Sequence, residues 1–165
     1  MTELNTLRPE VEDFLYRVSA ACDTQDWDAY LDFFTEDAEF HIPQWDSEHV
    51  HTTDPTREMS LMYYRNRAGL EDRVFRIRTG KSAASTPLPR TLHTITNVQV
   101  LAREGDTLTV AANWQTFYYR FGEANSFFGR VRYRIGKVGD DWKIHAKQTV
   151  LMNDKINAVL DFYHV

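Results

Sequence analysis

The chain has 165 residues, a formal net charge of −5 and hydrophobic residues at 42% of its positions. This length suits one folded domain with a real core, and we expect a single domain over residues 1–165. An acidic chain lacks the concentrated cationic surface that displaces counterions from phosphates, which argues against a nucleic-acid partner. No run approaches the ~20 apolar residues that cross a bilayer. The first residues lack the pattern of a secretory signal, so we expect a cytoplasmic protein without membrane contact.

Two short amphipathic helices are predicted at the start of the chain. Pro9 suits a first helical turn. The apolar residues that follow it have the three-and-four spacing of one helical stripe: Val11, Phe14, Leu15 and Val18. We expect this helix to end near Cys22. Asp26 can cap a second helix by accepting from free backbone amides. The apolar stripe of that second helix is Trp27, Tyr30, Leu31 and Phe34.

The next part of the chain combines one strand with helical segments. Residues 38–42 have strand character, and Pro43 ends the strand because it cannot donate to a ladder. An irregular connection follows over residues 44–54. Asp54-Pro55 then supplies a cap and a first-turn proline. The helix predicted from this signal includes Met59, Met62 and Tyr63. Gly69 interrupts the helical region before residues 70–78.

From Thr91 onward the pattern changes to long β-rich runs. Four strands are predicted, at residues 91–101, 107–121, 127–137 and 142–152. Compact turn signals separate them at residues 104–106 and 139–141. A final short helix is expected over residues 155–162. Helices followed by successive strands predict an α+β fold, a curved and mostly antiparallel sheet with the N-terminal helices packed on one face.

Cysteine content limits the chemistry of this chain. Cys22 is the only cysteine, so neither an internal disulfide nor a thiolate-rich metal site can form. A Rieske cluster needs two cysteines and two histidines. Cys22 also lies at the end of a predicted helix without a recognisable catalytic context, which favours a packing role.

Two groups of histidines are candidates for metal binding or acid-base chemistry. His49-Val50-His51, with Asp46 or Asp54, resembles part of an iron facial triad. We favour polar loop residues there and assign no metal. The second group combines three strand histidines with an acid: His41, His93, His145 and Asp37. A curved sheet can bring them toward one cavity as proton carriers, but we favour ordinary strand residues and assign no catalytic residue.

Arginines and aromatic rings indicate possible contact surfaces. Arg130, Arg132 and Arg134 alternate with apolar residues, which places three guanidiniums on one face of a strand. Both a partner contact and a solvated outer face explain this stripe. Aromatic residues occupy both faces of the neighbouring strands: Trp114, Phe117, Tyr118, Tyr119, Phe121, Phe127 and Phe128. A further arginine set, Arg73, Arg76 and Arg78, suits fixed ion pairs either within the chain or between chains.

Several segments carry a family resemblance that extends over most of the chain. The strongest is NRAGLEDRVFRIRTGK at residues 66–81, followed by PRTLH at residues 89–93. Others are Gln44-Trp45-Asp46, Asp54-Pro55, Asn113-Trp114 and Asp161-Phe162-Tyr163-His164. The chain resembles the small (β) subunit of aromatic-ring-hydroxylating dioxygenases, and most of all the benzoate and anthranilate 1,2-dioxygenase branch. Gly80-Lys81-Ser82-Ala83 departs from a version that commonly contains tryptophan, which leaves the substrate subtype open.

The resemblance implies a nuclear-transport-factor-2-like cone in a hetero-oligomer of three large (alpha) and three small subunits. It places the Rieske 2Fe-2S cluster, the mononuclear iron and the aromatic substrate in the large subunit, with NADH used through a separate reductase. This chain would hold no catalytic, cofactor or metal residue. It would self-associate as a trimer and use Arg130, Arg132 and Arg134 as subunit contacts. The alternative is a free-standing cone-fold lyase or isomerase using Asp37, His41 or His93.

Overall fold

The computed structural model describes residues 3–165, which form three helices and a six-stranded sheet. The helices are α1 (Glu3–Asp23), α2 (Trp27–Asp32) and α3 (Ala68–Arg78). The strands are β1 (Phe34–Pro43), β2 (Ser60–Tyr64), β3 (Arg90–Glu104), β4 (Thr107–Arg120), β5 (Glu123–Val138) and β6 (Asp141–Leu151). A short 3-10 helix, η1 (Phe162–His164), lies near the C-terminus.

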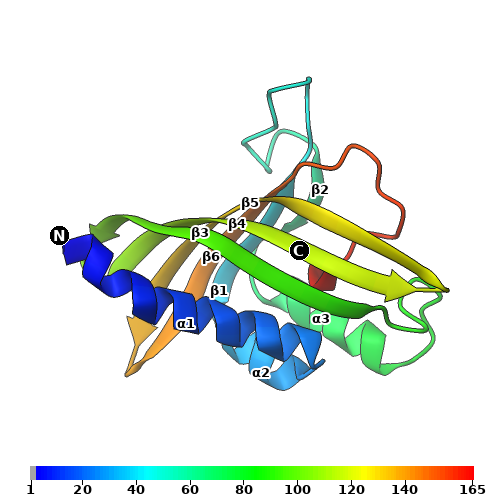
Figure 1. The fold of residues 1–165 in the computed structure, drawn as a ribbon, viewed down its shortest axis with the longest axis horizontal. Helices are drawn as coiled ribbons and strands as arrows, with labels where there is room; N and C mark the ends of the chain where they lie inside the picture. Colours follow the sequence, from blue (N-terminus) through cyan, green and yellow to red (C-terminus); the bar gives the residue numbers. More distant parts are fainter. Residues whose placement is uncertain (1–2) are drawn as a thin grey trace.

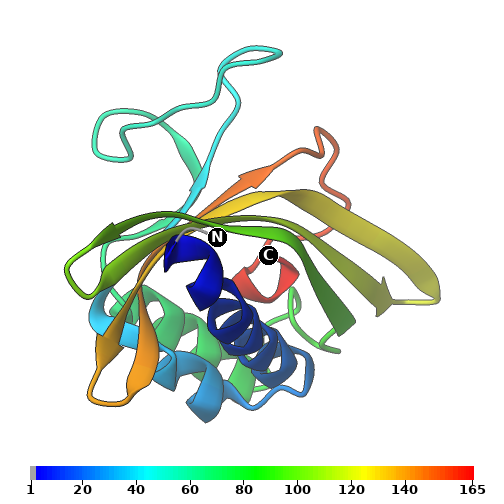
Figure 2. The same ribbon diagram turned by 60° about the vertical axis from the view of Figure 1, so that its left-hand side comes forward.

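The sheet is curved and leaves one of its faces without a helix. Its strand order is β2-β1-β6-β5-β4-β3, and every neighbouring pair is antiparallel except β1 and β6. The helices and η1 lie on the concave side, while the opposite face carries only the connections near its end (Figures 1 and 2). The predicted α+β class, with its mostly antiparallel sheet and N-terminal helices on one side, is confirmed.

The core forms between the helices and the concave face of the sheet. The predicted stripe of α1, from Val11 to Val18, is buried, because it faces inward-pointing side chains of the strands. Along β4 and β5 buried residues alternate with exposed or half-buried ones, as a sheet covered on one face requires. Asp26 caps α2 as predicted, with its Oδ1 atom accepting from the Ala29 backbone N–H at 3.2 Å.

The predicted helix after Asp54-Pro55 is wrong. Asp54 caps only a turn, where its Oδ1 atom accepts from the Thr56 backbone N–H at 2.9 Å. Residues 60–64 instead form β2, which pairs with β1. This pairing satisfies a ladder of backbone groups and overrides the local helical pattern. Gly69 does not interrupt a helix but lies in the first turn of α3, where a Cβ atom would stand 2.3 Å from the Tyr64 ring.

Three other predicted boundaries differ from the structure. The first helix begins at Glu3, so Pro9 lies inside it and not in its first turn. Phe34 does not extend α2, which ends at Asp32, because Phe34 begins β1 and lies beside Ile144 of β6. The expected helix over residues 155–162 is also wrong: that segment is irregular until η1 begins at Phe162. Within residues 3–165 no helix combines the length and apolarity needed to span a membrane.

Candidate functional site

The arginine stripe lies on the helix-free face of the sheet, which we call the outer face. Arg130, Arg132 and Arg134 are exposed, and the residues that alternate with them are buried against the core. The prediction that one strand face carries all three guanidiniums is therefore confirmed. Within residues 3–165 none of the three forms an ion pair, although ten pairs form elsewhere on the chain.

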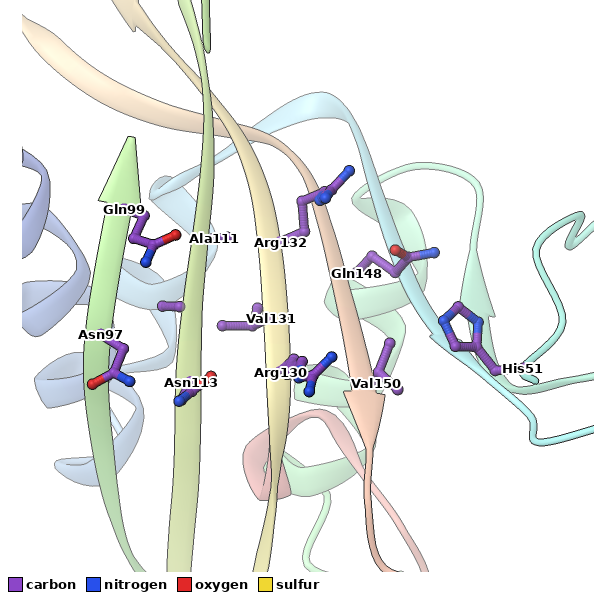
Figure 3. A pocket seen from close by; sticks show the side chains of 11 residues that line it. His51, Asn97, Gln99, Ala111, Asn113, Arg130, Val131, Arg132, Gln148 and Val150 are labelled. Atoms are coloured by element: carbon purple, nitrogen blue, oxygen red, sulfur yellow. The ribbon is translucent and has the colours of Figure 1, made fainter. Parts of the chain in front are cut away.

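Two of these arginines line a groove of about 460 Å³ on the outer face, which we call the arginine groove. Figure 3 shows Arg130 and Arg132 reaching from β5 toward β6, with Gln148 and His51 on the far side. Side-chain amides from three strands complete the polar lining: Asn97, Gln99, Asn113 and Gln148. Arg134 does not line the groove. The groove thus combines two cations with amide groups and contains no carboxylate.

A bulge in β3 helps to shape one wall of the arginine groove. Asn97 has a φ of 55°, in the left-handed region that non-glycine residues seldom adopt. The register of β3 against β4 shifts between Thr96 and Gln99, so the strand carries an extra residue at this point. Because asparagine is depleted in strands, Asn97 was a signal in the sequence for this bulge, and sequence reasoning missed it.

Exposed aromatic rings continue the outer face beyond the groove. Trp114, Tyr118 and Phe127 point into the core and are buried. The others are partly or largely exposed, at 46% for Phe117, 42% for Tyr119, 74% for Phe121 and 47% for Phe128. The prediction that aromatic rings occupy both faces of these strands is confirmed. Exposed aromatic rings and arginines on one face are typical of a protein-protein interface.

The concave interior is closed by the end of the chain. Residues 161–165 are all buried, and the Arg73 guanidinium of α3 pairs with the Asp161 carboxylate, with Nε 3.2 Å from each carboxylate oxygen. Lys147 Nζ donates to the Val165 backbone oxygen at 2.9 Å, and burial lowers the pKa of Lys147 to about 8. The cavity left among these groups is about 20 Å³. Sequence reasoning missed this closure.

The four groups weighed as proton carriers, His41, His93, His145 and Asp37, do not all meet in one cavity. His93 of β3 points inward, with its Nδ1 atom 2.5 Å from Asp23 Oδ1. His41 belongs to the outer face, where its Nε2 atom lies 3.0 Å from Ser60 Oγ. Asp37 is exposed at the start of the sheet. Thr35 Oγ1 donates to Asp37 Oδ1 at 2.7 Å and lies 3.5 Å from His145 Nδ1, so Asp37 and His145 are close together. His93 points to the other face of the sheet and cannot join them.

The chain's residues do not fit a Rieske cluster or another thiolate-rich metal site. Cys22 is fully buried, and burial raises the pKa of its thiol to about 12, so it stays protonated at neutral pH. His49 is exposed, and the Nδ1 atom of His51 lies 2.8 Å from the Thr52 carbonyl. Among residues 3–165, no group of three or more histidines, cysteines or acids is arranged to hold a metal ion.

Two of the three arginines of α3 make ion pairs within the chain, whereas Arg76 is exposed and forms none within residues 3–165. Arg73 pairs with Asp161, and Arg78 pairs with Asp28 of α2 at 2.8 Å. These contacts decide part of the question that the sequence left open. They hold α3 against the terminal segment and α2, which fixes the layer beneath the sheet.

Comparison with known proteins gives concordant results. The model of the ring hydroxylating beta subunit family matches residues 17–158. The anthranilate 1,2-dioxygenase small subunit of Acinetobacter baylyi is 50% identical, covering 94% of this chain and 95% of that one. The benzoate 1,2-dioxygenase subunit beta of the same organism is 42% identical, covering 94% and 92%.

A solved structure agrees with these relatives. The beta subunit of benzoate 1,2-dioxygenase from Burkholderia mallei superposes with a TM-score of 0.80 at 44% identity, covering 95% of this chain and 96% of that one. The similarity extends over nearly the whole chain. The chain therefore belongs to the family of ring hydroxylating beta subunits.

Proposed function

We propose that this chain is the structural small subunit of a Rieske non-haem iron dioxygenase that dihydroxylates an aromatic carboxylate such as benzoate or anthranilate. The 50% identity to an anthranilate 1,2-dioxygenase small subunit over nearly the full length supports this assignment. The large subunit carries the Rieske cluster, the mononuclear iron and the substrate. Electrons from NADH arrive through a separate reductase. Three large and three small subunits assemble in the cytoplasm.

The closed interior is the main observation that supports a non-catalytic role for this chain. A lyase or isomerase of this fold would need a substrate cavity beneath the sheet, and ligand pockets are on the order of 300 Å³ or more. The interior cavity that His93, Lys147 and Val165 line is about 20 Å³, and residues 161–165 are all buried. His93, the one predicted proton carrier that points there, is held by Asp23. The structure therefore favours the subunit over the free-standing enzyme.

The outer face supplies the surface for assembly. Guanidinium groups form strong, directed hydrogen bonds with carboxylates, so Arg130, Arg132 and Arg134 are suited to subunit contacts. They lie on a face that no helix covers, next to exposed rings such as Phe117 and Phe128. Aromatic residues and arginine are enriched at protein-protein interfaces, and this face carries both.

Co-expression with the cognate large subunit tests the proposal. A tag on the large subunit should retain this chain through gel filtration, and sedimentation should show one complex that contains both chains. If this chain elutes separately from the large subunit when both proteins are at micromolar concentrations, the structural role is contradicted. A variant of an exposed residue remote from the outer face, Asp140→Asn in the β5–β6 turn, serves as the control and should assemble normally.

A further inference from the structure

We propose that the arginine groove of one copy of this chain receives a hairpin from a second copy, so that copies join head to tail. The hairpin comprises residues 45–51, and we call residues 46–50 its tip. This inference rests on the proposed function as an assembling subunit, and it names the partner of the groove. The evidence is charge complementarity between the groove and the tip, although His51, at the base of the hairpin, lines the groove of its own copy.

The 45–51 hairpin is held in a defined shape at its base. Trp45 and His51 form an antiparallel bridge, with their rings edge to face and the centroids 5.6 Å apart. Trp45 Nε1 donates to the Leu151 carbonyl at 2.7 Å, which fastens the base to the end of β6. At the tip, the Asp46 backbone N–H donates to the Val50 carbonyl at 2.8 Å. A hairpin ordered in this way loses little conformational freedom on binding.

The tip presents carboxylates that have no cation of their own. Every residue from 46 to 50 is exposed, and the connection between β1 and β2 stands away from the sheet in Figures 1 and 2. Asp46 and Glu48 form no ion pair within residues 3–165. Val50, which is 57% exposed, adds an apolar contact. By contrast, Glu58 in the same connection accepts from the backbone N–H groups of Thr53 and Asp54.

The arginine groove has the complementary chemistry. Arg130 and Arg132 bring two guanidiniums to it, and its lining includes no acidic residue. Such a cationic groove suits an acidic partner, and the chain itself is acidic, with a net charge of −5. Charge-assisted pairs between guanidinium and carboxylate are about twice as strong as neutral hydrogen bonds. Val150, at the edge of the groove, offers an apolar surface for the Val50 side chain.

The contact that results is of the head-to-tail type. Groove and tip are different surfaces, so each copy gives its tip to one neighbour and its groove to another. Such heterologous contacts close into a ring when the rotation between copies permits. A closed ring of three copies satisfies every groove and every tip, which agrees with the trimer in the proposed assembly.

Charge reversal on the full-length chain tests this contact. The groove variant carries Arg130→Glu and Arg132→Glu, and the tip variant carries Asp46→Arg and Glu48→Arg. Each should weaken self-association at least tenfold in sedimentation equilibrium, and the chain with all four changes should recover association. Lys81→Glu, at an exposed position between α3 and β3 and outside the groove, is the control and should associate as the wild type does.

The outcomes separate this inference from the proposed function. If the groove variant and the tip variant still self-associate, the hairpin contact is overturned. It is also overturned if the fourfold variant keeps the wild-type melting temperature but does not recover self-association. A wild-type chain that stays monomeric in isolation also overturns it. Capture of the wild-type chain by a tagged large subunit is measured in parallel. If the large subunit does not capture this chain, the proposed function is contradicted instead.

Discussion

The buried pair between Arg73 and Asp161 should make a large contribution to stability. The Asp161 side chain is 1% exposed and that of Arg73 is 20% exposed. Asp161→Asn removes the negative charge and leaves the guanidinium partly buried without a partner. Breaking a buried pair in this way costs about 3–5 kcal/mol. We expect a loss of about 3 kcal/mol, at the lower end of that range, because an asparagine oxygen can still accept from the Phe162 backbone N–H.

Urea unfolding of the purified chain measures this effect against a matched control. Asp28→Asn removes the other ion pair of α3, between Arg78 and Asp28, whose side chains are 51% and 82% exposed. An exposed pair contributes at most about 1 kcal/mol. If Asp161→Asn lowers the free energy of unfolding by no more than Asp28→Asn does, the terminal segment is not anchored as described.

Three further predictions concern the packing of the same domain. Gly129→Ala should destabilise the fold by about 2 kcal/mol, because a Cβ atom would stand 1.9 Å from the Val150 carbonyl oxygen, and Ser126→Ala is the control in urea unfolding. Phe162→Ala should cost about 3–5 kcal/mol through the cavity it leaves, whereas Phe75→Ala, at a 69% exposed position, should cost under about 0.5 kcal/mol. Burial lowers the pKa of His164 from 6.5 to about 3, so stability should fall as pH decreases from 6.5 toward 3, and His164→Gln should flatten that dependence in melting curves.

The long strands and the first helix were predictable because their signals are local and repetitive. The α1 stripe from Val11 to Val18 and the alternation of β5 from Arg130 to Arg134 each repeat one period over several residues. A repeat of this kind fixes which face is buried before any tertiary contact is known. That is why the orientation of the arginine stripe could be predicted, although its partner could not.

The rest of the structure depends on distant contacts that local pattern cannot reveal. Residues 60–64 form a strand because β1 is available to pair with them, not because of their own periodicity. The terminal segment packs into the core, where Asp161 pairs with Arg73, 88 positions away. His51 reaches the arginine groove through the fold of a long connection. Each of these features is set by the packing of segments far apart in sequence.

The central claim is that this chain supports the chemistry of a larger enzyme without performing it. Iron analysis and oxygen uptake with benzoate or anthranilate test it most directly, on the lone chain and on its complex with the large subunit and reductase. We expect the lone chain to be iron-free and inactive, and iron and oxygen uptake to accompany the large subunit. Substrate-dependent oxygen uptake by the purified lone chain would contradict the account.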